Sequence, residues 1–414
     1  MYKICVFLFF VLFSIQEVFS SGFQLNDHSG RSVGMSFSTV ANIFDPSAIY
    51  YNPAAMTTTP STLSISAGTA YIMPGSKFTG ITDLNQQITE SVETWNFVIP
   101  HFYAVWKTPL DGLTFGAGVF VPFGLGTQWP DDWYGRHSAL KTYLEAIEIN
   151  PNLAYRFKVA DIPVSIAAGF GFVLGNVELQ KKLDLFNPEP LLKLKGDGNG
   201  TTFNFAIHLE PIQNMKIGAS YRHNIEIEFE GDVEYENISG VEPLFQGGKG
   251  GTKINFPNNL KFGIAYQILD GFWLEAGIDY TGWSSYDSLV INFDKGPGNP
   301  SAPYSSRQER AYKNVIAYRL AGEYQINNDW TARLGLGYDP IPVDPDFVEP
   351  VLPEGNRIIC SAGLGYKITR NFSVDLGYCA IIGQQTEVEN NVNNINGLYN
   401  MWANILCLTI NYNY

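Results

Sequence analysis

One pattern recurs through most of the chain: about ten residues in which apolar and polar side chains alternate, followed by a turn. In the stretch 272–280, every second residue from Phe272 to Tyr280 is apolar, while Glu275 and Asp279 lie on the opposite face. A period of two is typical of β-strands with one apolar and one polar face. A soluble sandwich has the same period, so alternation predicts an all-β fold without choosing its architecture.

The lengths of the connections separate a sandwich from a barrel. Short turns such as Leu269–Gly271 and Asn327–Asp329 alternate with long polar connections such as 227–252 and 281–311. Short turns at one rim and long loops at the other are typical of outer-membrane barrels. The chain ends on an alternating strand closed by Tyr414, and pairing of this strand with the first would remove both sheet edges. We therefore predict a transmembrane antiparallel β-barrel over residues 60–414.

The alternation gives about fourteen candidate strands, an even number as in bacterial outer-membrane barrels. They are Thr62–Tyr71, Phe97–Trp106, Leu113–Phe123, Ala146–Phe157, Val164–Val177, Thr201–Leu209, Met215–Glu226, Lys253–Gln267, Phe272–Tyr280, Tyr312–Tyr324, Trp330–Tyr338, Arg357–Ile368, Phe372–Ile382 and Met401–Tyr414. We expect the segments between them to be turns and loops.

The first twenty residues, Met1–Ser20, have the features of a secretory signal peptide. Lys3 precedes an apolar run from Ile4 to Phe13, and Val18 and Ser20 stand at the −3 and −1 positions of a cleavage site. The run is too short to cross a bilayer as a helix. We therefore expect the mature chain to begin near Ser21, in the envelope of a Gram-negative bacterium.

Charge and composition exclude several classes of function. A net charge of −14 and a pI near 4.8 argue against nucleic-acid binding, which requires a basic surface. No later apolar run is long enough for a transmembrane helix. Beyond the signal segment, Cys360, Cys379 and Cys407 form an odd set without metal-ligand spacing, so we expect free thiols packed in strands.

No motif for catalysis or cofactor binding stands out. The five histidines lack metal-ligand spacing, and no serine lies in a Gly-x-Ser-x-Gly elbow. The Gly-x-Gly pairs lie in strand patterns and not before a helix, so they predict packing positions and not a phosphate site. Asp131 and Asp132 form a solvated loop turn more readily than a cation site. We expect neither an enzyme nor a bound metal or cofactor.

The segment Ser21–Thr59, between the signal peptide and the first strand, does not alternate. Its apolar residues are interrupted by Gly, Ser, Asn and Pro, and this composition favours a compact but irregular structure that needs a protein wall around it. If the remainder closes into a barrel, the natural place for this segment is the lumen. We call it the plug.

Several short blocks, spread from end to end of the chain, together resemble the FadL and TodX family of outer-membrane transporters for hydrophobic compounds. In the plug these blocks are Gly22–Leu25, Asp45–Ala48 and Asn52-Pro53-Ala54. In the barrel they are Val119–Pro130, Trp330–Arg333 with the later Tyr338-Asp339, and Gly363–Tyr366. Each block alone is a weak signal, but their order matches that family.

The resemblance implies an uncommon transport route, in which a kink in the third strand opens a lateral gap facing the plug. Here the kink would fall at Pro122, Phe123 and Gly124, with Asn52, Pro53 and Ala54 lying against it. An apolar solute crossing a polar lumen forfeits its hydrophobic transfer energy, so delivery sideways into the bilayer is favourable. Pro122 lacks an amide donor, and this lack interrupts a strand ladder. An ordinary proline at a strand end is the alternative interpretation.

Two sets of side chains are candidates for ligand contact. By alternation, five cations point inward and would meet a fatty-acid carboxylate: Arg156, Arg222, Lys261, Arg319 and Arg333. Five apolar plug residues would line the acyl pocket: Phe23, Leu25, Ile43, Phe44 and Ile49. The alternatives are a paired polar network that stiffens the lumen and a plug that is merely packed.

Taken together, the sequence predicts a monomeric outer-membrane barrel with an N-terminal plug. The expected function is passive passage of a long-chain fatty acid, or of another hydrophobic molecule, into the outer-membrane lipid. An uptake channel for monoaromatic hydrocarbons is the nearest alternative. A general porin, an adhesin built on the long loops and a membrane-embedded lipid hydrolase are more distant ones.

Overall fold

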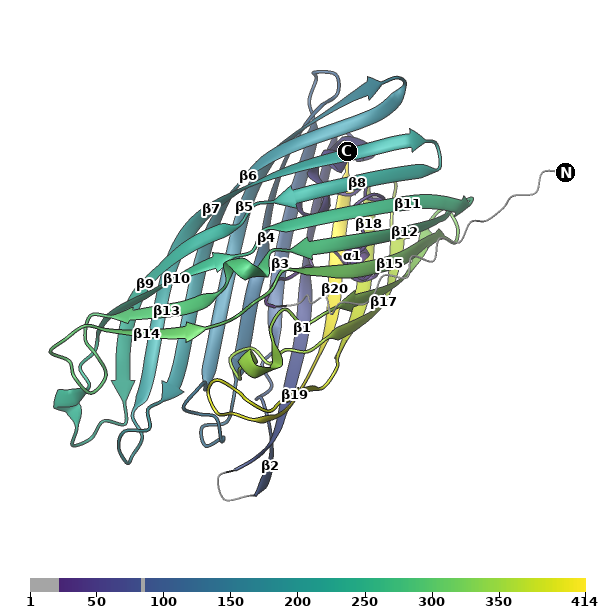
Figure 1. Cartoon of the computed structure of the whole chain (residues 1–414). Coiled ribbons are helices and arrows are strands. Elements are labelled where there is room, and N and C mark those ends of the chain that lie inside the picture. Colours follow the sequence, from purple (N-terminus) through teal and green to yellow (C-terminus); the bar gives the residue numbers. More distant parts are fainter. Residues whose placement is uncertain (1–21, 83–85) are drawn as a thin grey trace.

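The chain forms a closed antiparallel β-barrel, seen in a computed structural model that describes residues 22–82 and 86–414 (Figure 1). Neighbouring strands pair in sequence around the ring, and β1 closes it by pairing with β20 from Ser64↔Asn413 to Gly80↔Gly397. Fourteen strands make up the ring: β1 (Leu63–Ile81), β3 (Phe97–Lys107), β4 (Leu113–Gln128), β5 (Lys141–Val159), β6 (Ile162–Lys182), β7 (Leu191–Ile212), β8 (Met215–Arg222), β11 (Asn259–Leu269), β12 (Phe272–Thr281), β15 (Val315–Gln325), β16 (Trp330–Asp339), β17 (Arg357–Lys367), β18 (Phe372–Gly383) and β20 (Gly397–Asn413). The predicted barrel of about fourteen strands is confirmed.

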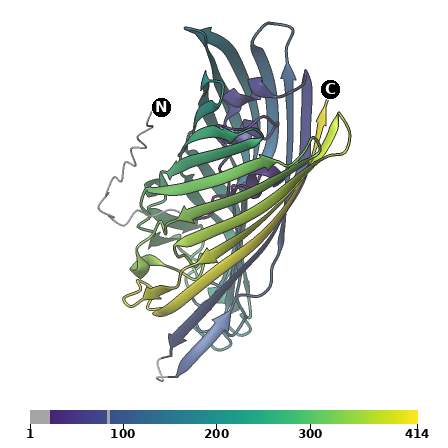
Figure 2. The ribbon, with the colours of Figure 1, turned by 90° about the vertical axis from the view of Figure 1, so that its right-hand side faces the viewer.

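Six further strands extend the sheet beyond the ring at the end with the long connections (Figures 1 and 2). They are β2 (Gln87–Ser91), β9 (Ile225–Glu236), β10 (Gly248–Phe256), β13 (Ser288–Phe293), β14 (Tyr304–Glu309) and β19 (Thr386–Val388). The prediction of loops over 227–252 and 281–311 was therefore wrong for much of each segment. The predicted strand 253–267 is divided by a break at Pro257, and three short 3-10 turns, η2 (Glu242–Leu244), η3 (Trp283–Ser285) and η4 (Pro345–Phe347), lie in these connections.

The two faces of the barrel follow the alternation in the sequence. Large apolar side chains project from the outer face, as Val98 (65% exposed) and Leu334 (68%) do. Charged residues such as Glu275 (1%) and Asp375 (8%) are buried on the inner face. An apolar exterior around a polar interior is the arrangement that a lipid environment requires. Among the described residues, the helices are all too short or too polar to cross a membrane.

The described part of the plug lies within the ring of strands in both views (Figures 1 and 2). It contains two single-turn helices, α1 (Gly30–Val33) and α2 (Ala48–Tyr51), and the 3-10 helix η1 (Pro53–Thr58). Ser29 caps α1 through its side chain, and Asn52 caps η1 by accepting from the Ala54 amide at 3.2 Å. The predicted signal peptide Met1–Ser20 lies outside the described residues.

Buried charges on the wall hold the plug in place. The Glu275 carboxylate accepts hydrogen bonds from the backbone amides of Val40, Ala41 and Asn42, at 2.6, 3.0 and 2.8 Å. Arg31 of the plug donates to Glu323 on β15 at 2.9 and 3.0 Å. Because these charges are removed from water, each depends on its partner across the plug–wall interface.

Candidate ligand-binding site

The hydrogen-bonded wall is interrupted between β3 and β4. The two strands pair only from Phe102↔Val119 to Lys107↔Thr114, although β4 continues to Gln128. On its other side, β3 stays paired with β1 as far as Phe97↔Ile72. Of the described residues, 97–101 of β3 and 120–128 of β4 therefore face one another without a ladder. We call this stretch of β3 and β4, which lacks backbone pairing, the opening.

A β-bulge in β4 coincides with the start of this opening. On the side of β5, Phe120 pairs with Glu148 and Phe123 with Ala146, so β4 carries one extra residue. Pro122 lies in the bulge and has no amide hydrogen for the ladder. From Phe120 to Phe123 every side chain is buried, whereas burial alternates along the preceding part of β4. The bulge thus turns this stretch of the strand toward the lumen.

The first described residues of the plug form hydrogen bonds with backbone groups of β4 that are not paired with β3. Leu25 donates its amide to the Pro122 carbonyl at 2.9 Å, and Gly124 donates to the Phe23 carbonyl at 3.0 Å. Between them Gln24 forms an antiparallel bridge with Phe123. A three-residue strand of the plug thus replaces the neighbour that β4 lacks here, and these backbone groups do not depend on water.

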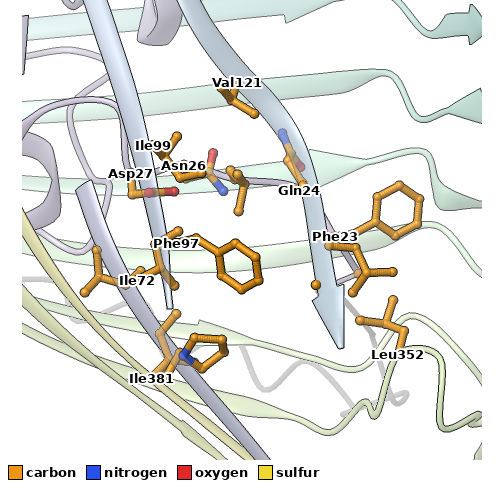
Figure 3. A pocket seen from close by; sticks show the side chains of 18 of the residues that line it. Phe23, Gln24, Asn26, Asp27, Ile72, Phe97, Ile99, Val121, Leu352 and Ile381 are labelled. Carbon is orange, nitrogen blue, oxygen red and sulfur yellow. The ribbon is translucent and has the colours of Figure 1, made fainter. Parts of the chain in front are cut away.

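A largely apolar cavity of about 190 Å³ lies beside this junction (Figure 3). Its walls come from the plug, from β1, β3 and β4 around the opening, and from β20, β18 and β17, which follow β1 around the ring. The apolar lining includes Phe23, Leu25, Phe37, Ile72, Phe97, Ile99, Val121, Leu144, Leu352, Ile359, Ile381 and Ile405. For comparison, a dry apolar cavity of about 150 Å³ in another protein binds benzene. The cavity is thus sized for one aromatic ring or a short acyl segment.

Four charged residues contribute to the lining of this cavity: Asp27, Glu145, Asp339 and Arg357. Asp339 is bonded to Arg319, and Arg357 donates to Glu354 at 2.9 Å and to the Gly22 carbonyl at 3.3 Å. Asp27 differs, because its Oδ2 is buried and has no hydrogen-bond partner among the described residues.

Aromatic side chains cover the opening between β3 and β4. A Cβ built on Gly126 would lie 2.0 Å from the Phe97 ring, so this ring rests directly on the glycine backbone across the gap. Trp95 packs against Phe97, with ring centroids 5.0 Å apart, and stacks on Tyr143 at 5.7 Å. Only a residue without a side chain allows Phe97 to approach β4 this closely.

The five apolar plug residues predicted to line a pocket do not all reach it. Phe23 and Leu25 do, together with Gly124 of the predicted kink. Ile43 and Ile49 belong to a separate buried cluster. Phe44 is 40% exposed and lines a second cavity together with Arg31, whose guanidinium is 4.5 Å from the ring centroid. Ile43, Phe44 and Ile49 therefore lie apart from the cavity that Phe23 and Leu25 line, and a shared acyl pocket for all five residues stays a prediction.

Asn52, Pro53 and Ala54 lie in another part of the plug, where hydrogen bonds of Asn52 fix its position and Ala54 shares a buried cluster with Phe120. The Asn52 amide donates to the Val40 carbonyl at 2.8 Å and to the Ile207 carbonyl on β7 at 3.2 Å. All three residues are fully buried. The segment that pairs with the kink at Pro122 and Gly124 is 23–25, so Asn52 fixes the plug to another part of the wall.

The five predicted inward cations are all ion-paired, and none lines the cavity. Arg222 pairs with Glu148, and Arg319 pairs with Asp339 and lies 3.6 Å from Asp279. Lys261 lies 3.5 Å from Asp279 and donates to Asn26 at 2.7 Å. Arg333 contacts Glu323 and Asp375 at 2.7 and 2.6 Å, and Arg156 contacts Glu210 at 2.9 Å. Their partners favour the paired network over a carboxylate site.

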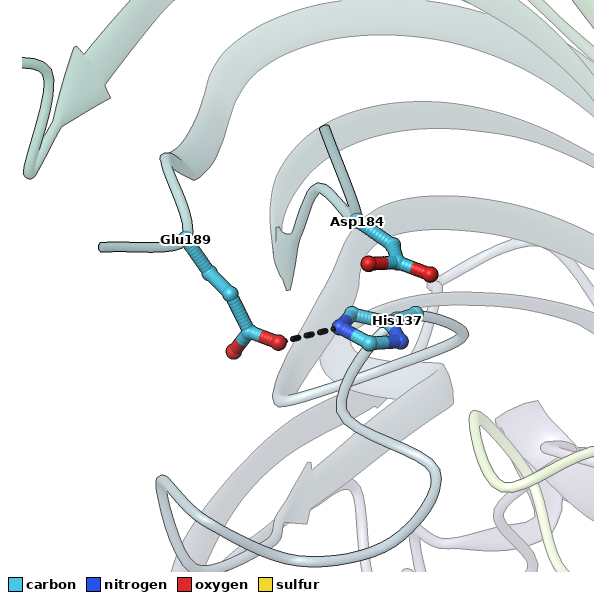
Figure 4. Close-up of side chains that lie close together, drawn as sticks. All are labelled: His137, Asp184 and Glu189. Atoms are coloured by element: carbon cyan, nitrogen blue, oxygen red, sulfur yellow. Dashed lines mark hydrogen bonds and ion pairs between the residues drawn. The ribbon is translucent and has the colours of Figure 1, made fainter. Parts of the chain in front are cut away.

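The structure brings together three side chains in the outer connections that the sequence analysis did not group: His137, Asp184 and Glu189 (Figure 4). Their ligand-type atoms lie within 4.8 Å of one another, and His137 Nε2 is 2.8 Å from Glu189. Arg136 also binds Glu189 through two bonds of 2.8 Å, and the Arg136 hydrogen bond is the main cause that lowers the pKa of Glu189 to about 2. The guanidinium already occupies both oxygens and would repel a metal ion. The cluster acts as an ion pair between two loops.

The sequence did contain a signal for the cavity that our prediction missed. A water-filled lumen calls for polar inward residues, yet Phe97 and Ile99 on β3 and Ile72 on β1 are apolar and point inward. Apolar inward residues on adjacent strands mark a lumen wall that binds something other than water. Asp27 gave no comparable signal, because its burial depends on how the plug folds.

Comparison with known proteins places this geometry in context. Residues 11–414 match the family model described as outer membrane protein transport protein (OMPP1/FadL/TodX). A long-chain fatty acid transport protein of Escherichia coli O6:H1 is 25% identical, over 90% of this chain and 89% of that protein. A Pseudomonas aeruginosa FadL homologue superposes with a TM-score of 0.83 at 20% identity, covering 95% of this chain and all (100%) of the other. The Pseudomonas putida toluene transporter TodX gives 0.73 at 16% identity, covering 96% and 99%.

Proposed function

Because the chain belongs to the OMPP1/FadL/TodX family of outer-membrane transport proteins, we propose that it carries hydrophobic molecules passively and releases them sideways through the barrel wall. Family membership makes it an outer-membrane transport protein of a Gram-negative bacterium and not an enzyme. Three further points belong to our proposal. The ligand binds beside the plug, a single barrel is the working unit, and outer-membrane lipid accepts the ligand.

One observation supports the proposal. Within the described part of the barrel wall, the apolar cavity borders the only stretch where a β-bulge lies next to an interruption of the hydrogen-bonded ladder, here between β3 and β4. Phe97 and Gly126 line the cavity and also face each other across the unpaired stretch of β3 and β4. A ligand leaving at this point passes from apolar side chains to lipid and keeps its hydrophobic transfer energy. A route along the polar lumen would forfeit that energy.

Two substrate classes follow from the names of the similar proteins. A long-chain fatty acid is the substrate named for the relative with 25% identity. Toluene is named for one of the solved structures. The cavity of about 190 Å³ favours the smaller class at this site, because it exceeds a benzene-sized cavity of about 150 Å³ only slightly. A long acyl chain would fill it with one segment while the remainder extends through the opening.

Deletion of Pro122 tests the lateral route. The deletion removes the one extra residue of the bulge, so β4 can pair regularly with β5 and continue its ladder toward β3. We expect uptake of radiolabelled oleate and toluene by cells producing this variant to fall toward the level of cells without the protein. Heat-modifiable gel mobility and surface labelling report whether the barrel is folded and present.

The matched control is Pro151→Val in the neighbouring strand. The β5–β6 ladder skips Asn150 and Pro151 but resumes without a register shift. Restoring a backbone amide at position 151 therefore does not change the course of β5. We expect wild-type uptake from this control. A folded Pro122 deletion that takes up both labelled compounds as fast as the wild type would refute the lateral route.

A further inference from the structure

The cavity is lined by the Asp27 carboxylate, one oxygen of which is left unpartnered by the residues that the structure describes. Asp27 is 1% exposed and lies at the end of the cavity away from Phe23 and Leu352, beside Asn26 and Ile99 (Figure 3). Its Oδ2 has no hydrogen-bond partner among the described residues. Leaving a buried acceptor unpaired costs free energy, and the cost is larger for a charged group. A group of this kind in a ligand-sized cavity can accept a hydrogen bond from a ligand that carries a donor.

The cations nearest to the cavity are committed to other acids. Arg357 is bound to Glu354 at 2.9 Å, and Arg319 is bound to Asp339. Lys261 donates to the Asn26 side chain at 2.7 Å and pairs with Asp279. With its cations paired, the cavity keeps the charges of Asp27 and Glu145 in excess. A ligand carboxylate would meet repulsion here.

Asp27 remains mainly an acceptor at neutral pH, although burial favours its protonated form. Asp27 belongs to the plug and not to a membrane-spanning strand, and burial raises the pKa of its carboxyl to about 6. At neutral pH most molecules therefore carry an ionised Asp27, which accepts hydrogen bonds and donates none. The complementary ligand group is a neutral donor such as a hydroxyl.

From this geometry, and resting on the proposed transport role, we infer that Asp27 binds the head group of the transported molecule. The ligand is a small uncharged hydrophobe with one hydrogen-bond donor, of the class of a phenol or a medium-chain alcohol. Its apolar body packs against Phe97, Ile99 and Ile72, and its hydroxyl donates to Asp27 Oδ2. The cavity volume limits the body to about one ring, by comparison with a benzene-sized cavity.

The test compares three ligands with the same ring: p-cresol, toluene and 4-methylbenzoate. Binding to the full-length mature protein in lipid nanodiscs is measured by calorimetry or by saturation-transfer NMR, with empty nanodiscs subtracted. We expect the wild type to bind p-cresol about tenfold more tightly than toluene, the typical effect of one hydrogen bond to a charged group. We expect 4-methylbenzoate to bind more weakly than either.

Two variants of Asp27 make the test specific. In Asp27→Leu the acceptor is lost, so the preference for p-cresol over toluene falls to about one. In Asp27→Asn the charge is lost while an acceptor oxygen remains, so binding of 4-methylbenzoate relative to p-cresol rises about tenfold. Asp232→Asn removes the same unit of charge from an exposed position outside the cavity and controls for a general charge effect. It should leave the ratio of p-cresol to toluene within about twofold of the wild type.

The outcomes separate cleanly. A folded Asp27→Leu variant that keeps the tenfold preference for p-cresol overturns the inference. If that variant does not fold, an Asp27→Asn variant with an unchanged 4-methylbenzoate to p-cresol ratio overturns it equally. These are equilibrium binding ratios and do not depend on the exit route. A failure of the Pro122 deletion test would therefore remove the proposed lateral exit while leaving the role of Asp27 to be decided by binding.

Discussion

The attachment of the plug to β12 through Glu275 gives the sharpest test of how the lumen is kept closed. One carboxylate, 1% exposed, accepts three hydrogen bonds of 2.6 to 3.0 Å from consecutive backbone amides of residues 40–42. Glu275→Ala removes all three acceptor interactions and leaves three buried N–H groups without a partner. Each orphaned group costs roughly 1–3 kcal/mol, so the attachment weakens by roughly 3–9 kcal/mol.

This loss falls on the plug and not on the ring of strands. Glu275 projects inward from β12, and the ladders of β12 with β11 and β15 involve only its backbone. We therefore expect a barrel with normal heat-modifiable mobility and a plug that detaches locally around Val40. Proteolysis of the purified protein should cut the plug faster than in the wild type. Cells producing the variant should become sensitive to vancomycin, a large polar antibiotic that a plugged barrel excludes.

Two further variants calibrate the result. Glu275→Gln keeps one acceptor oxygen, so its effect should be intermediate between wild type and Glu275→Ala. Asp232→Ala removes an exposed acid that pairs with Lys249 at the surface, where a salt bridge contributes about 0–1 kcal/mol, and should change neither readout. The reasoning fails if folded Glu275→Ala shows wild-type protease protection of the plug together with unchanged vancomycin resistance.

Two further predictions concern the opening and the outer loops. Phe97→Ala removes the ring that covers Gly126, so we expect faster uptake of labelled oleate with unchanged barrel folding, and uptake at or below the wild-type rate would contradict a covering role. In the outer loops, the hydrogen bond from Arg136 lowers the pKa of Glu189 from its usual value of 4.5 to about 2. The ion pair therefore stabilises the loops fully above about pH 4.5, and this contribution is lost as the pH falls toward 2. Hydrogen exchange of residues 183–190 should therefore rise on acidification in the wild type and be pH-independent, after correction for intrinsic rates, in Glu189→Gln.

The barrel could be predicted from the sequence because each ring strand carries its own signal. Alternation marks the strand, and a turn such as Leu269–Gly271 marks its end, so no long-range information is needed. The outer strands were missed for a local reason. In β9, glutamates alternate with Ile225, Ile227 and Phe229, and their charge suggested a solvated loop, although the intervening residues are buried. The glutamates of β9 indicate that one face of the strand is solvated, but we interpreted them as evidence for a loop.

The candidate site was less predictable because its contacts join distant parts of the chain. Alternation correctly placed Arg319 and Arg333 on the inner face, but it does not predict which acidic residue each arginine pairs with. The plug contacts depend on its irregular path, as when the Gly30 amide donates to Thr409 on β20 at 2.9 Å. Asp27 could not be recognised as unpartnered until every neighbouring donor had been placed.

The arrangement of the plug suggests how binding and release are coupled on the proposed route. Phe23 and Leu25 line the cavity with their side chains and hold the edge of β4 with their backbones. A ligand that fills the cavity presses on residues that also complete the interrupted sheet. If Leu25 moves, its amide and the Pro122 carbonyl lose their hydrogen bond, and a buried backbone group left without a partner costs roughly 1–3 kcal/mol. The plug is therefore most stable while it pairs with β4, and on the proposed route this pairing would return it to its place after each passage.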